Sequence, residues 1–341
     1  MQDAFGMTKR VLITGGAGYI GAHTCLVLAE RSYEAVVYDN LSNGHAEFVR
    51  WGAFEQGDIR DTDRLRSVFR QYQPDAIIHF AGLIEVAESV RDPLAFYNNN
   101  VSGTLSLLTA AEAAGVDKIV FSSTCATYGI PQFTPLTEDH VQAPISPYGW
   151  SKLLVEHILR DLSGLDRIRC AILRYFNAAG ADPEARIGEW HTPETHAVPL
   201  VIETALGQRD CFTIFGDDYD TADGTCIRDY VHVIDLADAH VRAVEYLLND
   251  GASVALNLGT GTGTSVAELV ETVAMVSGRS VKTRRAERRP GAPPILLADN
   301  RRARDVLGWQ PQHDLASSIE SAWRWHTKSN LLAAGASRST P

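Results

Sequence analysis

A tyrosine and a lysine four residues apart, Tyr148 and Lys152, have side chains and a spacing suited to acid–base chemistry. They open an expected helix from Pro147 to about Ser163, so both side chains lie on one helix face. A phenol has a pKa of about 10, and a neighbouring ammonium and a cationic ring would stabilise the phenolate and lower that pKa. The tyrosine can then remove a hydroxyl proton while hydride leaves the same carbon.

Thr124 is the expected third member of this group. It stands at the carboxyl end of an expected strand, where open α/β sheets place their chemistry. Its hydroxyl can relay the proton or orient the substrate. The alternative is a threonine that only satisfies nearby backbone groups.

The hydride acceptor is indicated by a glycine-rich stretch between an apolar run, Val11–Thr14, and an expected helix, Tyr19–Arg31. Gly16, Gly18 and Gly21 fit the pattern G-x-G-x-x-G. These glycines permit a tight turn and a close approach of backbone to a pyrophosphate, which the helix N-terminus attracts. A glycine-rich turn without a ligand is the alternative.

An acid suited to a ribose follows at Asp39, where the next apolar run ends. A carboxylate there would repel a 2′-phosphate, so the sequence favours NAD over NADP. Asp58 either accepts a hydrogen bond from the adenine amino group or caps the following helix. The sequence leaves both roles of Asp58 open.

Strands and helices alternate as far as Tyr175, which predicts an α/β fold with a Rossmann-type doubly wound parallel sheet. The expected strands are Val11–Thr14, Ala35–Tyr38, Ala53–Gln56, Ala76–Phe80, Lys118–Ser122 and Ile168–Tyr175. The expected helices are Tyr19–Arg31, Asp61–Tyr72, Pro93–Ala114 and Pro147–Ser163. Three neighbouring amides, Asn98 to Asn100, lie within the third helix and would reach toward a strand end or a ligand.

The alternation breaks at Asn177, which predicts a smaller C-terminal α/β substrate-binding domain. Helices are expected at Pro199–Gly207, Asp235–Asn249 and Leu315–His326, and the strand Val254–Leu258 is expected to return to the first sheet. The predicted division is a cofactor-binding domain at 8–180, with a later return around 230–260, and a second domain at 181–330.

Composition narrows the class of protein. The 341 residues are 45% hydrophobic, and their net charge of −11 argues against general nucleic-acid binding. No apolar run reaches the ~20 residues of a membrane span, so we expect no membrane partner. The cysteines form no C-x-x-C pair, which suggests neither a metal site nor a disulfide framework. A reduced, cytoplasmic protein without a metal is therefore expected.

These motifs resemble the extended short-chain dehydrogenase/reductase superfamily, and within it most closely the UDP-glucose 4-epimerase (UDP-galactose 4-epimerase) family. The matching segments span residues 10 to 326. They are Thr-Gly-Gly-Ala-Gly-Tyr-Ile-Gly (14–21), Tyr-Asp-Asn-Leu (38–41), Gly-Asp-Ile-Arg-Asp (57–61), His-Phe-Ala-Gly-Leu (79–83), Ser-Ser-Thr-Cys-Ala-Thr-Tyr-Gly (122–129), Ser-Pro-Tyr-Gly-x-Ser-Lys (146–152), Arg-Tyr-Phe-Asn-Ala-Ala-Gly (174–180) and Asp-Gly-Thr-Cys-Ile-Arg-Asp-Tyr-Val-His-Val (223–233).

The resemblance implies NAD-dependent epimerisation at C4 of a UDP-sugar. Tyr148 would be the base, Lys152 would orient the nicotinamide ribose, and Thr124 would assist. The sugar would pass through a 4-keto form that rotates before hydride returns to its other face. With the motifs, this predicts cofactor contacts from Gly15, Gly18, Tyr19, Ile20, Gly21, Asp39, Asn40, Asn43, Asp58, Ile59, Phe80, Ala81, Gly82, Asn99, Ser122, Tyr148, Lys152 and Tyr175.

The resemblance also implies a substrate site. Asn177 would hold the diphosphate or the sugar, and Arg228 and Arg289 would clamp the phosphates, with solvated surface arginines as the alternative. His196 and Phe215 would flank the uracil. Thr124 and Tyr148 complete the expected set. The family commonly forms homodimers through the helices at 93–114 and 148–163.

Three positions depart from the family pattern. Ile84 replaces a lysine near the cofactor diphosphate, and Ala292 replaces an acid that holds the uridine ribose. Leu296 limits the sugar pocket with a side chain of intermediate size, so UDP-xylose, UDP-arabinose and UDP-N-acetylhexosamines stay open as substrates. A 4,6-dehydratase is less favoured, because Cys125 and Ala126 stand where that family has Asp-Glu. A simple NAD-dependent sugar dehydrogenase shares the first half-reaction.

Overall fold

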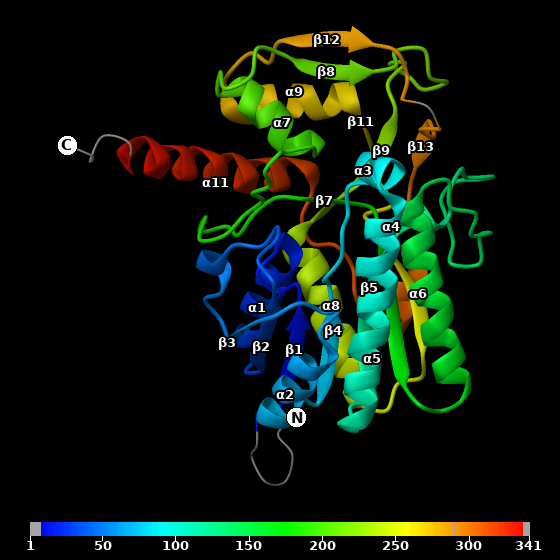
Figure 1. Ribbon diagram of the computed structural model, residues 1–341. Helices are drawn as coiled ribbons and strands as arrows, with labels where there is room; N and C mark the ends of the chain where they lie inside the picture. The colour runs from blue at the N-terminus through cyan, green and yellow to red at the C-terminus, as the bar shows by residue number, and fades with distance from the viewer. Residues whose placement is uncertain (1–7, 290, 337–341) are drawn as a thin grey trace.

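A seven-stranded, wholly parallel sheet underlies the larger part of this computed structural model, which describes residues 8–289 and 291–336 (Figure 1). The strand order is β10-β6-β5-β4-β1-β2-β3. The order reverses between β1 and β4, which is where open α/β sheets bind ligands. The strands are β1 Arg10–Thr14, β2 Glu34–Asp39, β3 Ala53–Gln56, β4 Ala76–His79, β5 Lys118–Thr124, β6 Arg169–Tyr175 and β10 Val254–Leu258.

Helices cover both faces of this sheet, because alternate residues of each strand point to opposite faces. Val11 and Ile13 of β1 pack with one group of helices, whereas Leu12 between them packs with the other. The first group is α1 Tyr19–Glu30, α8 Val233–Leu248 and α10 Arg301–Leu307. The second is α2 Thr62–Tyr72, α5 Gly103–Ala113 and α6 Pro147–Gly164.

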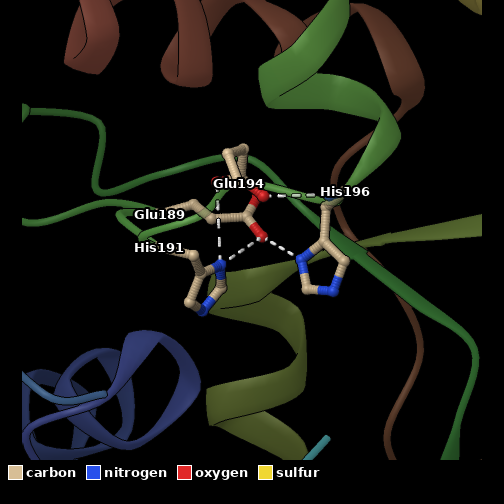
Figure 2. A group of neighbouring side chains, drawn as sticks. All are labelled: Glu189, His191, Glu194 and His196. Atoms are coloured by element: carbon tan, nitrogen blue, oxygen red, sulfur yellow. Dashed lines mark hydrogen bonds and ion pairs between the residues drawn. The ribbon is translucent and has the colours of Figure 1, made fainter. Parts of the chain in front are cut away.

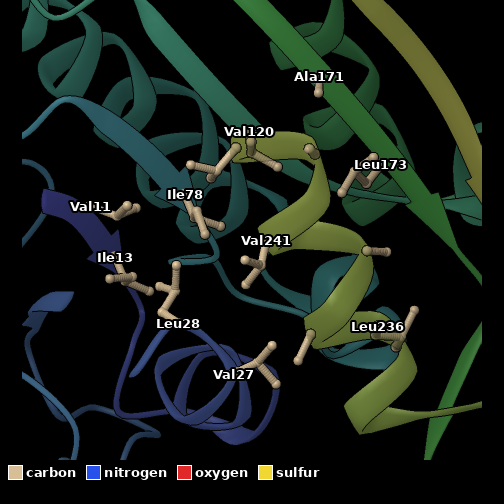
Figure 3. Packing of buried hydrophobic residues seen from close by; sticks show 14 of the residues in the cluster. Val11, Ile13, Val27, Leu28, Ile78, Val120, Ala171, Leu173, Leu236 and Val241 are labelled. Carbon is tan, nitrogen blue, oxygen red and sulfur yellow. The ribbon is translucent and has the colours of Figure 1, made fainter. Parts of the chain in front are cut away.

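The core between α1, α8 and the sheet is built from aliphatic side chains (Figure 3). Val27 and Leu28 of α1 meet Leu236 and Val241 of α8 over the strands, and all four are buried. The helix α8 comes late in the sequence, after the chain has left the sheet and returned to it. Strand β10 follows and pairs with β6.

The remaining elements form a smaller group beyond the carboxyl ends of the parallel strands (Figure 1). Its core contains Val201, Ile214, Leu269 and Ile319. Its strands are β7 Asn177–Ala179, β8 Phe212–Phe215, β9 Ile227–His232, β11 Gly263–Ser265, β12 Thr283–Ala286 and β13 Ile295–Leu296. Its helices are α7 Ala197–Ala205, α9 Val266–Ser277 and α11 Leu315–Ala336.

Short helical segments complete the described chain. Two 3₁₀ turns lie at Ala46–Phe48 and Cys125–Thr127, and α3 Val86–Arg91 precedes α4 Pro93–Phe96. No helix among the described residues is long and apolar enough to cross a membrane.

The predicted fold class is confirmed, the helix expected over Pro93–Ala114 is present with a π-helical turn inside it, and capping is excluded of the two roles left open for Asp58. The long helix expected over Pro93–Ala114 is divided into α4, a π-helical turn at Tyr97–Ser102, and α5. The Asn100 side chain in this turn bonds to the Leu83 backbone and to Ser151, outside the helix. Asp58 does not cap α2; Asp61 does so, accepting from the Arg64 amide at 2.9 Å.

Candidate active site

The glycine loop after β1 is pressed against the loop after β4. A side chain at Gly15 would place its Cβ 2.6 Å from the Ala81 amide nitrogen, and the Gly15 φ of +73° is itself left-handed. A Cβ at Gly21 would lie 2.3 Å from the Gly15 carbonyl oxygen. Only glycine fits at these positions, so the loop is set by close backbone contact.

The N-terminus of α1 opens directly from this loop. Gly18 is the N-cap and offers no side-chain hydrogen bond to the first turn. The exposed N–H groups of a helix start attract an anion such as a pyrophosphate. Ile20, in the first turn, packs against the apolar core under α1. The loop and the helix start therefore have the form of a dinucleotide phosphate site.

Asp39 ends β2 beside the glycine loop. Its carboxylate accepts from the Ala17 amide at 3.0 Å and from the Leu41 amide at 2.8 Å. Burial raises the carboxyl pKa, while these two bonds favour the charged form. Each oxygen keeps acceptor capacity, so the group can also receive a ribose hydroxyl.

The predicted adenine side is a small polar cluster at the ends of β2 and β3. Asp58 pairs with the Arg60 guanidinium, which holds the pKa of that carboxyl well below its usual range, and also accepts from Asn40 at 3.1 Å. Ile59 is buried and faces Gly103 of α5, whose added Cβ would lie 2.6 Å away. Asn43 lies exposed in the loop after β2.

The side chain of Tyr19, a predicted cofactor residue, bonds to another part of the protein. Its phenol is buried and donates to the Gly180 carbonyl oxygen at 2.6 Å. The side chain thus ties the start of α1 to the first residues of the smaller group of elements. If Tyr19 contacts the cofactor, it would do so through its backbone amide.

Tyr148 and Thr124 meet at the carboxyl end of β5. Burial raises the Tyr148 pKa above its ordinary value, and a hydrogen bond with the Thr124 side chain acts in the opposite direction. The Thr124 oxygen also accepts from the Ala126 amide at 3.1 Å. The predicted pairing of these two hydroxyls is present, although a lowered phenol pKa is not.

The Lys152 ammonium is bonded to β5. It donates to the Ser122 carbonyl oxygen at 2.9 Å and stands 5.0 Å above the centre of the Phe121 ring. Burial lowers the Lys152 pKa to about 8, against a smaller raising effect of Glu156. In this position the ammonium faces the sheet and the loop after β4, where a Cβ on Gly82 would lie 3.4 Å from its nitrogen.

Further predicted cofactor residues lie at or just beyond the carboxyl ends of β4, β5 and β6. The Ser122 hydroxyl is 2.8 Å from the Tyr175 hydroxyl. The Phe80 ring packs 4.6 Å from the His240 ring, between the loop after β4 and α8. Residues from β4, β5, β6 and α6 therefore converge on one point at the carboxyl edge of the sheet.

Asn100, which the sequence analysis did not select, is the central amide of the asparagine triplet. It accepts from the Leu83 amide at 2.8 Å and donates to the Leu83 carbonyl oxygen and the Ser151 hydroxyl, each at 3.0 Å. The predicted Asn99 only supports it, donating to its side-chain oxygen at 3.0 Å. The signal was the triplet itself, but spacing alone did not show which amide turned inward.

A buried ion pair behind α6 was also missed. Glu156 binds Arg174 through both carboxylate oxygens, at 3.0 and 2.7 Å, and accepts from Ser123 at 2.6 Å. Arg174 also donates to the Tyr128 hydroxyl at 2.8 Å. This network fixes the strand that carries Thr124 against the helix that carries Lys152.

The predicted substrate residues come from the smaller group of elements. Asn177 is exposed on β7, and Arg228 lies on β9 with its guanidinium bonded to the Ile227 carbonyl oxygen at 2.8 Å. The Arg289 guanidinium stands 4.2 Å above the Phe215 ring, so these two are brought together. His196 is bonded instead to Glu189.

The structure also places the three positions that depart from the family pattern. Leu296 on β13 is paired in register with Arg228, and it packs against the same buried cluster as Cys125, which follows Thr124. Ile84 lies half-buried in the loop after β4. The Ala292 amide donates to the Arg289 carbonyl oxygen at 3.1 Å, which folds this loop back on itself.

Known proteins resemble this chain over nearly its whole length. The family model for GDP-mannose 4,6 dehydratase matches residues 12–322. UDP-glucose 4-epimerase of Rhizobium meliloti is 62% identical over 322 residues, covering 94% of this chain and 98% of that protein. The crystal structure of UDP-glucose 4-epimerase from Brucella ovis in complex with NAD has a TM-score of 0.91 at 49% identity, covering 93% and 98% of the two chains. The enzyme from Stenotrophomonas maltophila, with bound NAD and formylated UDP-arabinopyranose, has a TM-score of 0.93 at 39% identity, covering 95% and 99%.

Proposed function

The chain belongs to the UDP-glucose 4-epimerase family of the extended short-chain dehydrogenases/reductases, and we propose that it interconverts UDP-glucose and UDP-galactose with NAD that stays bound. It is an NAD-dependent UDP-sugar 4-epimerase, hence an isomerase. The observation that carries the proposal is the meeting of Tyr148 and Thr124 at the end of β5, with Lys152 one helical turn along α6.

The residues present fit NAD. Gly15 approaches Ala81 so closely that only backbone fits between them, and the start of α1 can bind a diphosphate. Asp39 is the last residue of β2, where a dinucleotide-binding fold places the acid that binds the adenosine ribose. We propose that the loop after β4, with Phe80, Ala81 and Gly82, carries the diphosphate toward Lys152. When bound, NAD supplies a reversible hydride acceptor.

We propose that Tyr148 removes the proton of the sugar C4 hydroxyl and later returns it. Thr124 shares a hydrogen bond with that phenol and can hold the C4 oxygen in line for the transfer. Since burial opposes the phenolate, a positive charge must offset it, and Lys152 is the nearest cation on the same helix face. The Lys152 ammonium, which donates to the Ser122 carbonyl oxygen, would also donate to the nicotinamide ribose. The Ser122 and Tyr175 hydroxyls would lie beside that ribose.

The nucleotide would lie across the smaller group of elements. Arg228 and Arg289 would bind the diphosphate, since guanidinium matches phosphate in charge and geometry. Phe215, already stacked under Arg289, and the outer edge of His196 would flank the uracil. Asn177 at the start of β7 would contact the sugar or the diphosphate. We propose the division into an NAD-binding part at 8–180, with the return around 230–260, and a nucleotide-sugar part at 181–330.

Elimination is disfavoured despite the name of the matching family model. A 4,6-dehydratase needs an acid and a base for C5 and C6 beside the strand-end threonine, whereas this chain has Cys125 and Ala126 there. The Cys125 thiol is no substitute, because burial raises its pKa to about 12. The acids of the dehydratase chemistry are therefore missing from this position.

The outer face of the helices α4, α5 and α6 supports a homodimer. Large apolar side chains are exposed there, among them Leu94, Leu105, Trp150 and Leu154. An apolar surface of this kind marks an interface more often than it faces water. We propose that two copies meet through this face, and that the enzyme works in the reducing cytoplasm, since its five cysteines are free.

The test is a substrate panel on the purified protein, with product analysis by chromatography and no added NAD. We expect UDP-glucose and UDP-galactose to interconvert without accumulation of NADH. Release of NADH in step with turnover would identify a dehydrogenase and overturn the proposal. Faster turnover of UDP-arabinose or of a UDP-N-acetylhexosamine would instead identify that sugar as the preferred substrate. Such substrates stay open because Leu296 limits the sugar pocket with a side chain of intermediate size.

A further inference from the structure

Four side chains from one loop converge at the base of α7 (Figure 2). The loop runs from 181 to 196, between β7 and α7, and contains the spacing Glu-x-His-x-x-Glu-x-His. One ligand atom from each of Glu189, His191, Glu194 and His196 lies within 4.8 Å of all the others. The cysteine spacing predicted no metal, and this pattern of glutamates and histidines contains no cysteine.

The interior of this cluster contains polar atoms that face each other without a hydrogen bond. The Glu189 and Glu194 side chains are 3% and 8% exposed, and His191 is 14% exposed. The His191 Nδ1 atom is buried and has no hydrogen-bond partner among the described residues. It lies 3.5 Å from Glu189 Oε1 and 3.7 Å from Glu194 Oε2, both beyond ordinary hydrogen-bond distance.

These separations suit a shared cation. Nitrogen and oxygen ligands at the bond lengths of tetrahedral zinc stand about 3.4 Å from one another. Two carboxylates and two neutral imidazoles also balance a divalent charge. From this geometry we propose that Glu189, His191, Glu194 and His196 bind one divalent transition metal of the Zn²⁺ class.

The surrounding contacts hold the ligands in place, as the partners of metal ligands generally do. Glu194 Oε1 accepts from the backbone amides of Thr195 and His196, at 2.8 and 2.9 Å, which turns its other oxygen toward His191. The Glu189 carbonyl oxygen accepts from the Trp325 indole at 2.9 Å. The His196 ring is bonded to Glu189 through Nδ1, so a metal there would replace one proton.

The metal would stabilise a loop that touches the NAD-binding part of the chain. Between the ligands, the Trp190 ring stacks on His45 at 4.5 Å, and its carbonyl oxygen accepts from the same histidine at 2.9 Å. Thr195 donates to Glu85 at 3.0 Å. A bound cation would join four positions of this irregular segment. The free energy of metal binding would then offset the conformational entropy lost when the loop is ordered. The role is structural, and no step of the hydride chemistry passes through it.

The experiment is a titration of the purified holoenzyme, stripped of metal by a chelator, with Co²⁺ as the spectroscopic probe. We expect one Co²⁺ per chain with the visible absorption of a tetrahedral site, and loss of that absorption when one equivalent of Zn²⁺ is added. His191→Ala should weaken Co²⁺ binding at least about tenfold. The matched control is His157→Ala, which removes an exposed histidine of α6 and should leave the titration unchanged.

Glu194→Gln gives the same comparison if His191→Ala fails to fold, because it keeps the size of the side chain and removes its charge. Equal Co²⁺ binding by the wild type and these variants would overturn the proposal. Absence of a Co²⁺ spectrum from the wild type would also overturn the proposal. The four side chains would then be a cluster of ion pairs, in which two protonated histidines neutralise two glutamates. The readout does not involve a sugar, so it stands apart from the test of epimerisation.

Discussion

The phenol of Tyr148 is buried where its reaction needs an anion. Burial raises its pKa and the hydrogen bond with Thr124 lowers it only in part, so the proposed role as a base requires a positive charge that arrives with the cofactor or turns toward the phenol. Lys152 carries the required charge but is bonded to Ser122. The proposed base would therefore be activated by cofactor binding rather than by the protein alone.

Replacement of Tyr148 by phenylalanine removes the proton acceptor and keeps the ring. We expect kcat to fall by roughly 10²–10⁴-fold, the usual contribution of a positioned acid or base. The measurement is the initial rate of conversion of UDP-galactose to UDP-glucose. Tyr33→Phe is the control, since Tyr33 precedes β2 at the opposite edge of the sheet. A Tyr148→Phe enzyme with wild-type kcat would contradict the assigned base.

Residue types predict chemistry well and orientation poorly. The tyrosine, lysine and threonine could be selected from the sequence because acid–base chemistry needs those groups at a strand end and one helical turn apart. The inward turn of Asn100 and the bond of the Tyr19 phenol could not be predicted, because both depend on which way a side chain turns. That turn is set by distant partners, Ser151 and Gly180.

The turn between β1 and α1 can be tested by comparing two glycines with the same backbone conformation. Gly15 and Gly115 have the same φ of +73°, but a Cβ at Gly15 would meet Ala81, whereas one at Gly115 meets nothing within 4 Å. Gly115→Ala should cost about 1 kcal/mol of stability from backbone strain alone. Gly15→Ala should cost more, and should also reduce the NAD that copurifies with the protein.

The measurements are urea unfolding and the absorbance of NAD released on denaturation. Equal losses of stability in the two variants, with full NAD content in both, would show that the Gly15–Ala81 contact does not shape the cofactor site.

The π-helical turn makes a second prediction at this level. Asn100 bonds the loop after β4 to α6, whereas Asn98 in the same turn is exposed. Asn100→Ala leaves the Leu83 amide and carbonyl without partners and should lower the free energy of unfolding by about 1–3 kcal/mol. Asn98→Ala should change it by less than about 0.5 kcal/mol. Urea midpoints decide the point, and indistinguishable midpoints would refute the bridging role of Asn100.

The elements differ in how far the sequence predicts them. Strands buried on both faces, such as β1 and β4, stand out as short apolar runs. The strand β12, Thr-Arg-Arg-Ala, does not, because its side chains are mostly exposed and its pairing with β8 lies some seventy residues away. The helix α9 was also missed, although Ser265 and Glu268 form a capping box at its start.

The molecule as a whole should be sensitive to acid. Burial lowers the pKa of His79 to about 3 and that of His23 to about 4, with similar shifts at His232 and His240, from an ordinary value of 6.5. As pH falls below 6.5, the unfolded chain takes up these protons and the native state does not. Stability present at pH 7 is therefore lost on acidification, by about 2 kcal/mol per histidine at pH 5.

Urea unfolding at pH 7 and pH 5 measures this loss. His79→Gln should reduce the difference between the two pH values, and His157→Gln, on the exposed face of α6, should not. A pH difference that is unaffected by His79→Gln would assign the acid sensitivity to other groups.

The proposed homodimer is tested on the same scale. Leu105→Glu places a charge in the exposed apolar face of α5 and should convert the dimer to a monomer, with the solution mass by light scattering falling by half. Met275→Glu is the control, because Met275 is as apolar and more exposed but lies on α9, in the other part of the molecule. A wild type that is already monomeric would refute the proposed dimer.

The return of the chain through α8 and β10 limits how this enzyme can be recombined with its relatives. A chimaera with a single crossover near residue 180 would set α8 of one parent on α1 of the other. Leu236 and Val241 would then have to fit against Val27 and Leu28 from a sequence with which they had not evolved (Figure 3). Transfer of sugar specificity therefore calls for separate inserts before α8, between β10 and α10, and after α10, with the sheet and its covering helices kept from one parent.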